Sequence, residues 1–130
     1  GAESASAKFV LEKRLGLESP PLICMGDAPD KPDPKGFIYL SKKLLGDKLG
    51  SSNIPIAYVG DTIADIITVI NARKEIPSQK FISIGLAPPH LHIKSRLKER
   101  KSYEENLRNA GADLILNSIY DLKNINLNLF

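Results

Sequence analysis

The sequence predicts an α/β fold in which a Rossmann-like parallel sheet is flanked by helices. Two observations support this class: short apolar runs typical of buried strands alternate with longer runs of helical period, and glycine or proline separates most of them. Strands that alternate with helices are typical of a parallel sheet. The 130 residues, of which 42% are hydrophobic, suffice for one core, so we expect a single domain over residues 1–130.

The first half of the chain contains three predicted elements. Residues 4–15 carry apolar side chains at helical spacing and end at Gly16, so they predict a helix. The apolar run 22–25 follows two prolines and predicts a short buried strand. A second helix is predicted over 34–45, because Pro34 suits a first helical turn and Gly46 stops the pattern. Its buried face is expected to carry Phe37, Leu40, Leu44 and Leu45.

The second half continues the alternation. The run 55–59 gives the strongest strand signal, and the helix predicted over 62–73 can be capped by Thr62 or Asp61. Its buried face is expected to carry Ile63, Ile66, Ile67 and Ile70. The remaining predicted elements are strands over 81–84 and 113–116, a loop over 87–92, a charged helix over 94–110 ended by Gly111, and a terminal helical turn over 119–122.

Composition excludes several classes of protein. No apolar run approaches membrane-spanning length and no signal peptide is present, so we expect no membrane partner. The single cysteine, Cys24, cannot form an internal disulfide and favours the cytoplasm or another reducing compartment. The chain begins at Gly1 rather than Met, so a targeting signal could have been lost with a missing N-terminus.

Two weaker features have simpler explanations. Basic residues crowd into 94–101, but no aromatic residues lie between them, so we expect an exposed helix face and no nucleic acid partner. His90 and His92 form a His-x-His pair in a predicted loop. No third ligand follows nearby, which favours a surface loop over a zinc site.

Two carboxylates mark the end of the strongest predicted strand. Asp61 follows the strand through Gly60, which allows a sharp turn, and Asp65 comes one helical turn later. Ligands of parallel sheets bind beyond the carboxyl ends of the strands, and carboxylates there suit Mg²⁺. The alternative is structural: Asp61 would cap the helix, and Asp65 would complement its dipole.

Lys31 is the second candidate. It follows the strand over 22–25, and Pro32 restricts it to an extended backbone while Pro34 begins the next helix. A rigid lysine at the carboxyl end of a strand can serve as a point charge for a phosphate group. Taken alone, Lys31 could equally be a surface lysine in a turn.

The order and spacing of these segments resemble the haloacid dehalogenase-like hydrolase superfamily, in particular its phosphoglycolate-phosphatase-like members. The matching segments are Lys31-Pro32-Asp33-Pro34, then Tyr58-Val59-Gly60-Asp61-Thr62-Ile63-Ala64-Asp65, and the closing Gly111-Ala112-Asp113-Leu114-Ile115-Leu116. The resemblance implies a Mg²⁺-dependent hydrolysis of a small phosphorylated metabolite through an aspartyl-phosphate intermediate. It implies that Lys31 steadies the phosphoryl group, that Asp61 binds Mg²⁺, and that Asp65 supports the metal or orients the lysine.

The chain departs from the family at its start. The Asp-x-Asp nucleophile motif is absent before Lys31, and so is the Ser or Thr of the second motif. The chain therefore resembles the C-terminal half of a hydrolase, with an incomplete N-terminal part, and we expect it to be inactive alone. The two missing strands would lie between those over 22–25 and 55–59. We therefore expect these two strands not to be neighbours, and a missing N-terminal segment of the same protein to complete the sheet.

Two other functions remain open. The chain could be a non-catalytic binding or regulatory module with a degenerate fold of this family, although the retention of Lys31, Asp61 and Asp65 argues against that. A receiver-like signalling domain would need an acidic pair and a phosphorylatable aspartate on early strands, and neither is present. The sequence does not distinguish phosphatase, dehalogenase and phosphonatase, because substrate choice resides in the missing region.

Overall fold

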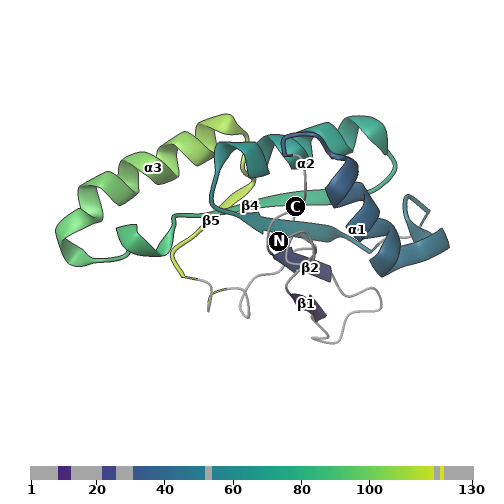
Figure 1. Cartoon of the computed structure of the whole chain (residues 1–130), viewed down its shortest axis with the longest axis horizontal. Coiled ribbons are helices and arrows are strands. Elements are labelled where there is room, and N and C mark those ends of the chain that lie inside the picture. Colours follow the sequence, from purple (N-terminus) through teal and green to yellow (C-terminus); the bar gives the residue numbers. More distant parts are fainter. Residues whose placement is uncertain (1–8, 13–21, 26–30, 52–53, 119–120, 122–130) are drawn as a thin grey trace.

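The computed structural model describes residues 9–12, 22–25, 31–51, 54–118 and 121, with backbone only for the first two segments. Its strands are β1 (Phe9–Glu12), β2 (Leu22–Met25), β3 (Ile56–Gly60), β4 (Phe81–Leu86) and β5 (Leu114–Leu116). Its α-helices are α1 (Lys35–Leu45), α2 (Ile63–Glu75) and α3 (Leu97–Ala110). Three short 3₁₀ turns are described, η2 (Gly46–Lys48), η3 (Pro89–Leu91) and η4 (Lys94–Arg96). Figure 1 shows how the helices and strands are arranged.

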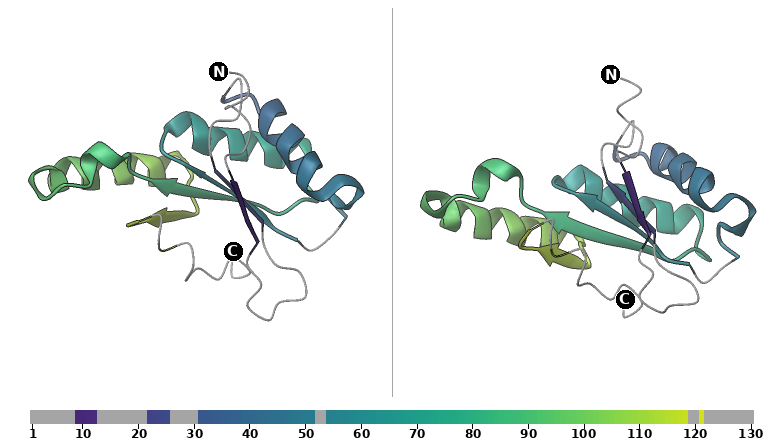
Figure 2. Two further views of the ribbon diagram at one scale, coloured as in Figure 1. Left: turned by 60° about the horizontal axis from the view of Figure 1, so that its bottom comes forward. Right: turned by 90° about the horizontal axis from the view of Figure 1, so that it is seen from below.

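The five strands form one sheet in chain order, β1-β2-β3-β4-β5. β2 to β5 are parallel to one another, and β1 pairs antiparallel with β2 at the edge. Each parallel connection steps in the same direction, so right-handed crossovers place every helix on the same face. Figures 1 and 2 show α1, α2 and α3 side by side on that face. The predicted α/β fold with a Rossmann-like parallel core is confirmed.

The prediction of a helix over 4–15 is wrong for residues 9–12, which are the part of this segment that the structure describes. Residues 9–12 form β1, which pairs with β2 in the register Phe9↔Met25 to Glu12↔Leu22. Helical periodicity alone predicts a helix only weakly, because tertiary contacts often override it. Here the edge of β2 offers hydrogen-bond partners to the backbone, which a helix would leave unused. Phe9 and Val10 also favour strands. The rest of the predicted helix lies outside the described residues.

The expectation that the strands over 22–25 and 55–59 are not neighbours is also wrong. β2 pairs directly with β3, in the register Leu22↔Ile56 to Met25↔Val59. This pairing satisfies the backbone groups that a gap would have left exposed on both strands. The gap between these strands that a missing N-terminal segment was expected to fill is therefore not present, so the prediction that such a segment completes the sheet there is wrong.

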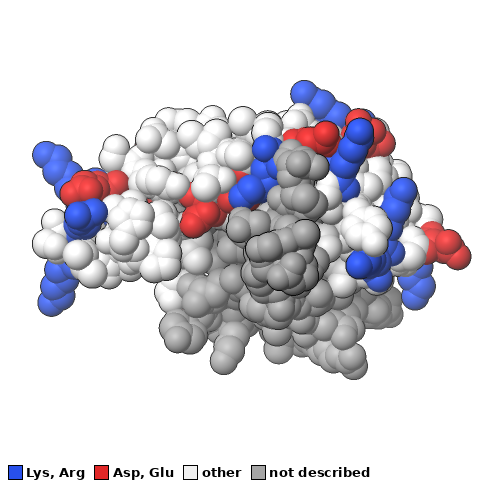
Figure 3. All heavy atoms as spheres, in the orientation of Figure 1, with Lys and Arg blue, Asp and Glu red and all other residues white. Residues whose placement is uncertain are grey.

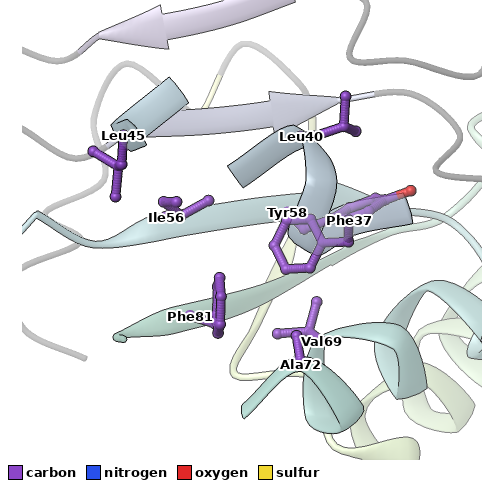
Figure 4. Packing of buried hydrophobic residues seen from close by; sticks show 8 residues of the cluster. All are labelled: Phe37, Leu40, Leu45, Ile56, Tyr58, Val69, Ala72 and Phe81. Atoms are coloured by element: carbon purple, nitrogen blue, oxygen red, sulfur yellow. The ribbon is translucent and has the colours of Figure 1, made fainter. Parts of the chain in front are cut away.

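The helix-covered face of the sheet contains an aromatic core. Phe37 of α1 lies 4.9 Å from the Tyr58 ring and 5.1 Å from the Phe81 ring, between centroids. Figure 4 shows the buried cluster, which consists of Phe37, Leu40, Leu45, Ile56, Tyr58, Val69, Ala72 and Phe81. The predicted face of α1 is confirmed for Phe37, Leu40 and Leu45, while Leu44 is only partly buried. α1 ends at Gly46 as expected.

The predicted buried face of α2 needs a correction. Ile66 is buried, but Ile67 and Ile70 are half-buried and Ile63 is exposed. The other buried side chains are Asp65, Thr68, Val69 and Ala72. α2 contacts α1 on one side, α3 on the other and β4 beneath, so its buried surface is broader than a single stripe of isoleucines. The centre of that surface lies to one side of the predicted isoleucine stripe.

The opposite face of the sheet is apolar as well. Its buried residues are Ala57, Val59, Ile82, Ile84 and Leu116, which alternate along their strands with residues that face the helices. No helix within the described ranges packs on this face (Figure 2). A search of the described residues finds no helix with the length and apolar character needed to cross a membrane.

The remaining predictions hold with small shifts. The strands expected over 81–84 and 113–116 correspond to β4 and β5, and the loop over 87–92 contains η3. The charged helix begins with η4 and continues as α3, which Gly111 ends at a φ of 119°. A side chain is strained at that φ, so glycine suits this position. The helical turn expected over 119–122 lies outside the described residues apart from Asp121.

Candidate functional site

The candidate site lies where β3 turns into α2. Thr62 is the N-cap of α2, and its hydroxyl oxygen accepts a hydrogen bond from the Asp65 backbone N–H at 3.1 Å. The Asp65 carboxylate in turn accepts the Thr62 backbone N–H at 3.0 Å, which completes a capping box. The sequence-based alternative, a structural role for Asp65 in the first helical turn, is therefore part of what the structure shows.

Asp65 does more than cap the helix. Its Oδ2 also accepts the Asp61 backbone N–H at 3.1 Å and the Thr62 hydroxyl at 2.8 Å. Its Oδ1 lies 2.8 Å from Lys31 Nζ and 3.4 Å from the Tyr58 hydroxyl. The side chain is only 3% exposed. A buried carboxylate needs such partners, and here donors surround both oxygens.

Gly60 makes this arrangement possible. A Cβ at position 60 would lie 2.3 Å from Asp65 Cβ, 2.5 Å from its Cγ and 2.6 Å from its Oδ2. Such distances are far below van der Waals contact, and the clashing atoms belong to a side chain fixed by hydrogen bonds. Glycine is required here for the close approach of the carboxylate rather than for backbone conformation.

Lys31 is held in place by its own turn. Asn71 of α2 donates a hydrogen bond from Nδ2 to the Pro32 carbonyl oxygen at 3.1 Å, and the Lys35 backbone N–H donates to Asp33 Oδ1 at 2.9 Å. The Lys31–Pro32 peptide bond is cis. The lysine side chain is 19% exposed, so solvent reaches part of it while its ammonium group contacts Asp65. The structure therefore brings Lys31 and Asp65 together across 34 residues of sequence.

Asp61 occupies a different environment from Asp65. Its side chain is exposed at the carboxyl edge of the sheet, while its backbone N–H points at Asp65 Oδ2. The three predicted site residues thus share one turn region, in which Lys31 Nζ lies 2.8 Å from Asp65 Oδ1. His90 and His92 do not join them: His90 is exposed, and His92 Nε2 bonds the Ala87 carbonyl oxygen at 2.7 Å.

Tyr103 is a residue of this site that sequence reasoning missed. Its hydroxyl donates to the backbone carbonyl oxygen of Asp61. The pKa of Tyr103 is raised, first by burial and then by the negative charges of Asp61 and Asp65. The phenol is therefore protonated and able to donate at neutral pH. No local motif marks Tyr103, because its role depends on how α3 packs beside α2.

The donor set allows a test of the expected Mg²⁺. Mg²⁺ is often held by one or two carboxylates, with water and phosphate oxygens completing its coordination. Asp61 fits that requirement as an exposed carboxylate. Asp65 fits less well, because its oxygens already accept hydrogen bonds and contact the lysine. Among the described residues, no three His, Cys, Asp or Glu side chains are grouped as a metal site.

The fold and site together define an α/β protein with a Rossmann-like core and a lysine–carboxylate pair at the carboxyl edge of its sheet. No family model, curated protein or solved structure matches the chain. The resemblance to haloacid dehalogenase-like hydrolases therefore rests on the motifs around Lys31 and Asp61 and on their order along the chain.

Proposed function

We propose that this chain is the phosphate- and metal-binding part of a Mg²⁺-dependent phosphomonoester hydrolase of the haloacid dehalogenase-like type. The observation that carries the proposal is the contact of 2.8 Å between Lys31 and Asp65 beside the exposed carboxylate of Asp61. A lysine, a fixed carboxylate and an exposed carboxylate at the carboxyl ends of parallel strands suit a phosphate ligand and its counter-ion.

In this proposal Asp65 positions Lys31. The donors around Asp65 hold its carboxylate rigidly, and the carboxylate then fixes the lysine ammonium at the carboxyl edge of the sheet. A lysine held in this way can contact a phosphate oxygen without a large loss of side-chain freedom. The metal role that the resemblance gives to Asp65 remains a prediction, and it would require Asp65 to exchange some of its present partners.

Asp61 would hold the Mg²⁺. The bound ion would offset the negative charge of the phosphate, which otherwise repels any anionic nucleophile. The nucleophilic aspartate would come from outside this chain, because no Asp-x-Asp motif precedes Lys31. Since β2 occupies the place beside β3, this group would have to approach the site from the carboxyl edge rather than from a strand between them.

The strand order favours a second candidate, a non-catalytic module that binds an anionic group of a partner at the sheet edge rather than a substrate in a crevice. Ligand crevices in open parallel sheets usually form where the strand order reverses. The described strands of this sheet run in chain order and have no such reversal. A module of this kind would retain Lys31 and Asp65 as an anion site without any reaction.

Binding and turnover measurements on the 130-residue chain test the proposal. We expect inorganic phosphate to bind by calorimetry with millimolar or tighter affinity in the presence of Mg²⁺, and at least 10-fold more weakly without it. Lys31→Met and Asp61→Asn should each weaken the Mg²⁺-dependent binding at least 10-fold, a difference of about 1.4 kcal/mol. Lys35→Met is the matched control, because Lys35 is an exposed lysine on the same turn.

The same preparation should not hydrolyse p-nitrophenyl phosphate with Mg²⁺. Appreciable turnover by the chain alone would overturn the claim that the nucleophile lies outside it. Phosphate binding that does not depend on Mg²⁺ but is lost in Lys31→Met would favour the non-catalytic module. Binding that Lys31→Met leaves unchanged would exclude both candidates.

A further inference from the structure

The helix α3 has two faces of opposite character. One face contacts the body of the protein with half-buried or buried side chains at spacings of three and four residues, namely Arg100, Tyr103, Glu104 and Leu107. Another side of the helix carries exposed side chains at Leu97, Lys98 and Lys101, and Lys94 in the preceding η4 is exposed as well. Within the described part of the chain, packing thus uses one face of the helix and leaves the basic side chains exposed.

Positive charge is concentrated at the free end of this helix. Residues 93–101, which we call the basic tip, carry five basic side chains and one acidic side chain. Their net charge therefore exceeds the +3 of the whole chain. Arg100 turns inward to Glu104 at 3.0 Å and to the Asn117 carbonyl oxygen at 2.8 Å, and Arg96 lies 3.9 Å from Glu99. No described carboxylate pairs with the lysines of the tip.

The basic tip also exposes aliphatic side chains. Ile93 is 53% exposed and Leu97 is 49% exposed, and the two residues flank the short turn η4. In the described part of the chain, the other exposed large hydrophobic side chains are Tyr39 at 59% and Ile63 at 46%. An aliphatic pair flanked by lysines combines an apolar contact with a charged rim, which is the usual anatomy of a protein interface.

The basic tip is accessible. Figures 1 and 2 show that the N-terminal end of α3 extends well beyond the ends of the strands. Figure 3 shows Lys and Arg side chains at that end, with acidic side chains close to them. The exposed lysines of the tip are therefore accessible to a partner.

We propose that the basic tip docks an acidic amphipathic helix of a partner protein. Glutamate or aspartate side chains would face Lys94, Lys98 and Lys101, and aliphatic side chains would cover Ile93 and Leu97. Because α3 begins at Leu97, the tip offers the partner little more than the first turn of this helix together with η4. So short an interface gives a weak, salt-sensitive complex.

Other anionic partners fit the tip less well. A nucleic acid backbone would satisfy the lysines but would leave the aliphatic pair without an apolar contact, and the tip has no aromatic side chain to stack on bases. A membrane-bound helix usually presents a longer apolar face than two aliphatic residues. The combination of charge and a small apolar centre favours a protein helix.

The test uses the full 130-residue chain and a labelled synthetic peptide of 16 residues, helical, with leucines at positions i, i+4 and i+7 and glutamates beside them. Fluorescence anisotropy should give a Kd of about 10–100 μM at low salt, and a scrambled peptide of the same composition should bind at least 10-fold more weakly. The double variant Lys98→Glu/Lys101→Glu should lose at least 10-fold in affinity, and Leu97→Ser about 5-fold.

The matched control is Lys42→Glu/Lys43→Glu, which makes the same charge change on exposed lysines of α1 and should leave the affinity within 2-fold of the parent. Equal binding of the scrambled peptide, or no binding at 1 mM, would overturn the proposal. So would tighter binding of a 12-nucleotide RNA or of phosphatidylserine vesicles that Leu97→Ser leaves unchanged. Circular dichroism would confirm that each variant is folded.

Discussion

Two ion pairs tie this molecule together at opposite edges of its sheet. At the carboxyl edge, Lys31 before α1 contacts Asp65 in the first turn of α2. At the amino edge, Arg73 near the end of α2 contacts Asp113 just before β5. Both pairs join segments that are distant in sequence, and both aspartates also accept backbone N–H groups.

The pairs differ in how the cation is used. The guanidinium of Arg73 donates to the Phe81 carbonyl oxygen through Nε and Nη2 as well as to Asp113, and Asp113 accepts the Ser83 backbone N–H at 2.8 Å. This planar donor set closes a network between α2, β4 and the start of β5. Lys31 instead brings a compact point charge to the edge where parallel sheets bind ligands. The comparison teaches that the amino-edge pair joins α2 to the sheet, whereas the carboxyl-edge pair is built on a buried aspartate and also presents a charge at the edge where ligands bind.

The largest effect is expected at the turn that supports the carboxyl-edge pair. Gly60→Ala would place a Cβ within 2.6 Å of three Asp65 atoms, so the carboxylate would have to leave its donors. We expect a loss of about 2–4 kcal/mol in the free energy of unfolding, measured by urea denaturation. A loss below 0.5 kcal/mol would contradict the described approach of Asp65 to Gly60.

The next largest effect is expected when each aspartate loses its charge, because the two ion pairs should then differ in how much stability they contribute. Asp65→Asn turns an amide toward the surrounding donors and removes the carboxylate that Lys31 contacts, so we expect a loss of about 2–3 kcal/mol in the free energy of unfolding. Asp113→Asn affects a pair that is more exposed, and we expect about 1 kcal/mol. Urea midpoints of the two variants give the comparison. A larger loss in Asp113→Asn would reverse the ranking of the two edges.

Substitutions of Arg73 and Lys31 should differ in their effect on phosphate binding, although both should lower the stability of the fold. Arg73→Lys cannot reproduce the planar donor set and should cost about 1 kcal/mol while leaving phosphate binding unchanged. Lys31→Met should cost about 1–2 kcal/mol, because Asp65 keeps its other donors, but should weaken Mg²⁺-dependent phosphate binding at least 10-fold. Denaturation and calorimetry on the same two variants check this. Phosphate binding lost equally in both would mean that the edges do not differ in function.

The smallest effect is expected at Tyr103, which joins α3 to the carboxyl-edge site. Tyr103→Phe removes the hydrogen bond to the Asp61 carbonyl oxygen and should cost about 1 kcal/mol at pH 7. The pKa of Tyr103 is raised in the folded state, so the unfolded chain releases the proton first as the pH rises through about 10. The stabilisation is therefore full below pH 10 and is lost above it. Urea titrations at pH 7 and pH 11 should show the difference between parent and variant shrinking.

Much of this fold could be predicted from local pattern. Runs such as 55–59 and 81–84 are apolar over a strand length, and Gly46 and Gly111 end helices, so elements with strong local signals were found at nearly their true bounds. The segment 9–12 was mispredicted because its apolar spacing suits a helix, and only the partner strand β2 decides its conformation. Local pattern carries no information about such partners.

The site shows the same limit. Asp65 and Lys31 could be proposed as neighbours because both follow strands of one parallel sheet. The hydrogen bonds from the backbone N–H groups of Asp61 and Thr62 to the Asp65 carboxylate could not be predicted, since they depend on the geometry of a single turn. The pairing of β2 with β3 was mispredicted because the family resemblance supplied an order that this chain does not adopt. Tyr103 was missed because its contact spans 42 residues.

The strand order β1-β2-β3-β4-β5 has a consequence for how the chain can fold during synthesis. Each strand pairs with the strand made immediately before it, so no strand has to wait for a partner near the C-terminus. Domains that fold as the N-terminal part emerges are less exposed to trapping with unpaired edges. In this chain the growing sheet would have only one open edge at a time at which to add the next strand, and each new helix would cover the strand pair just formed.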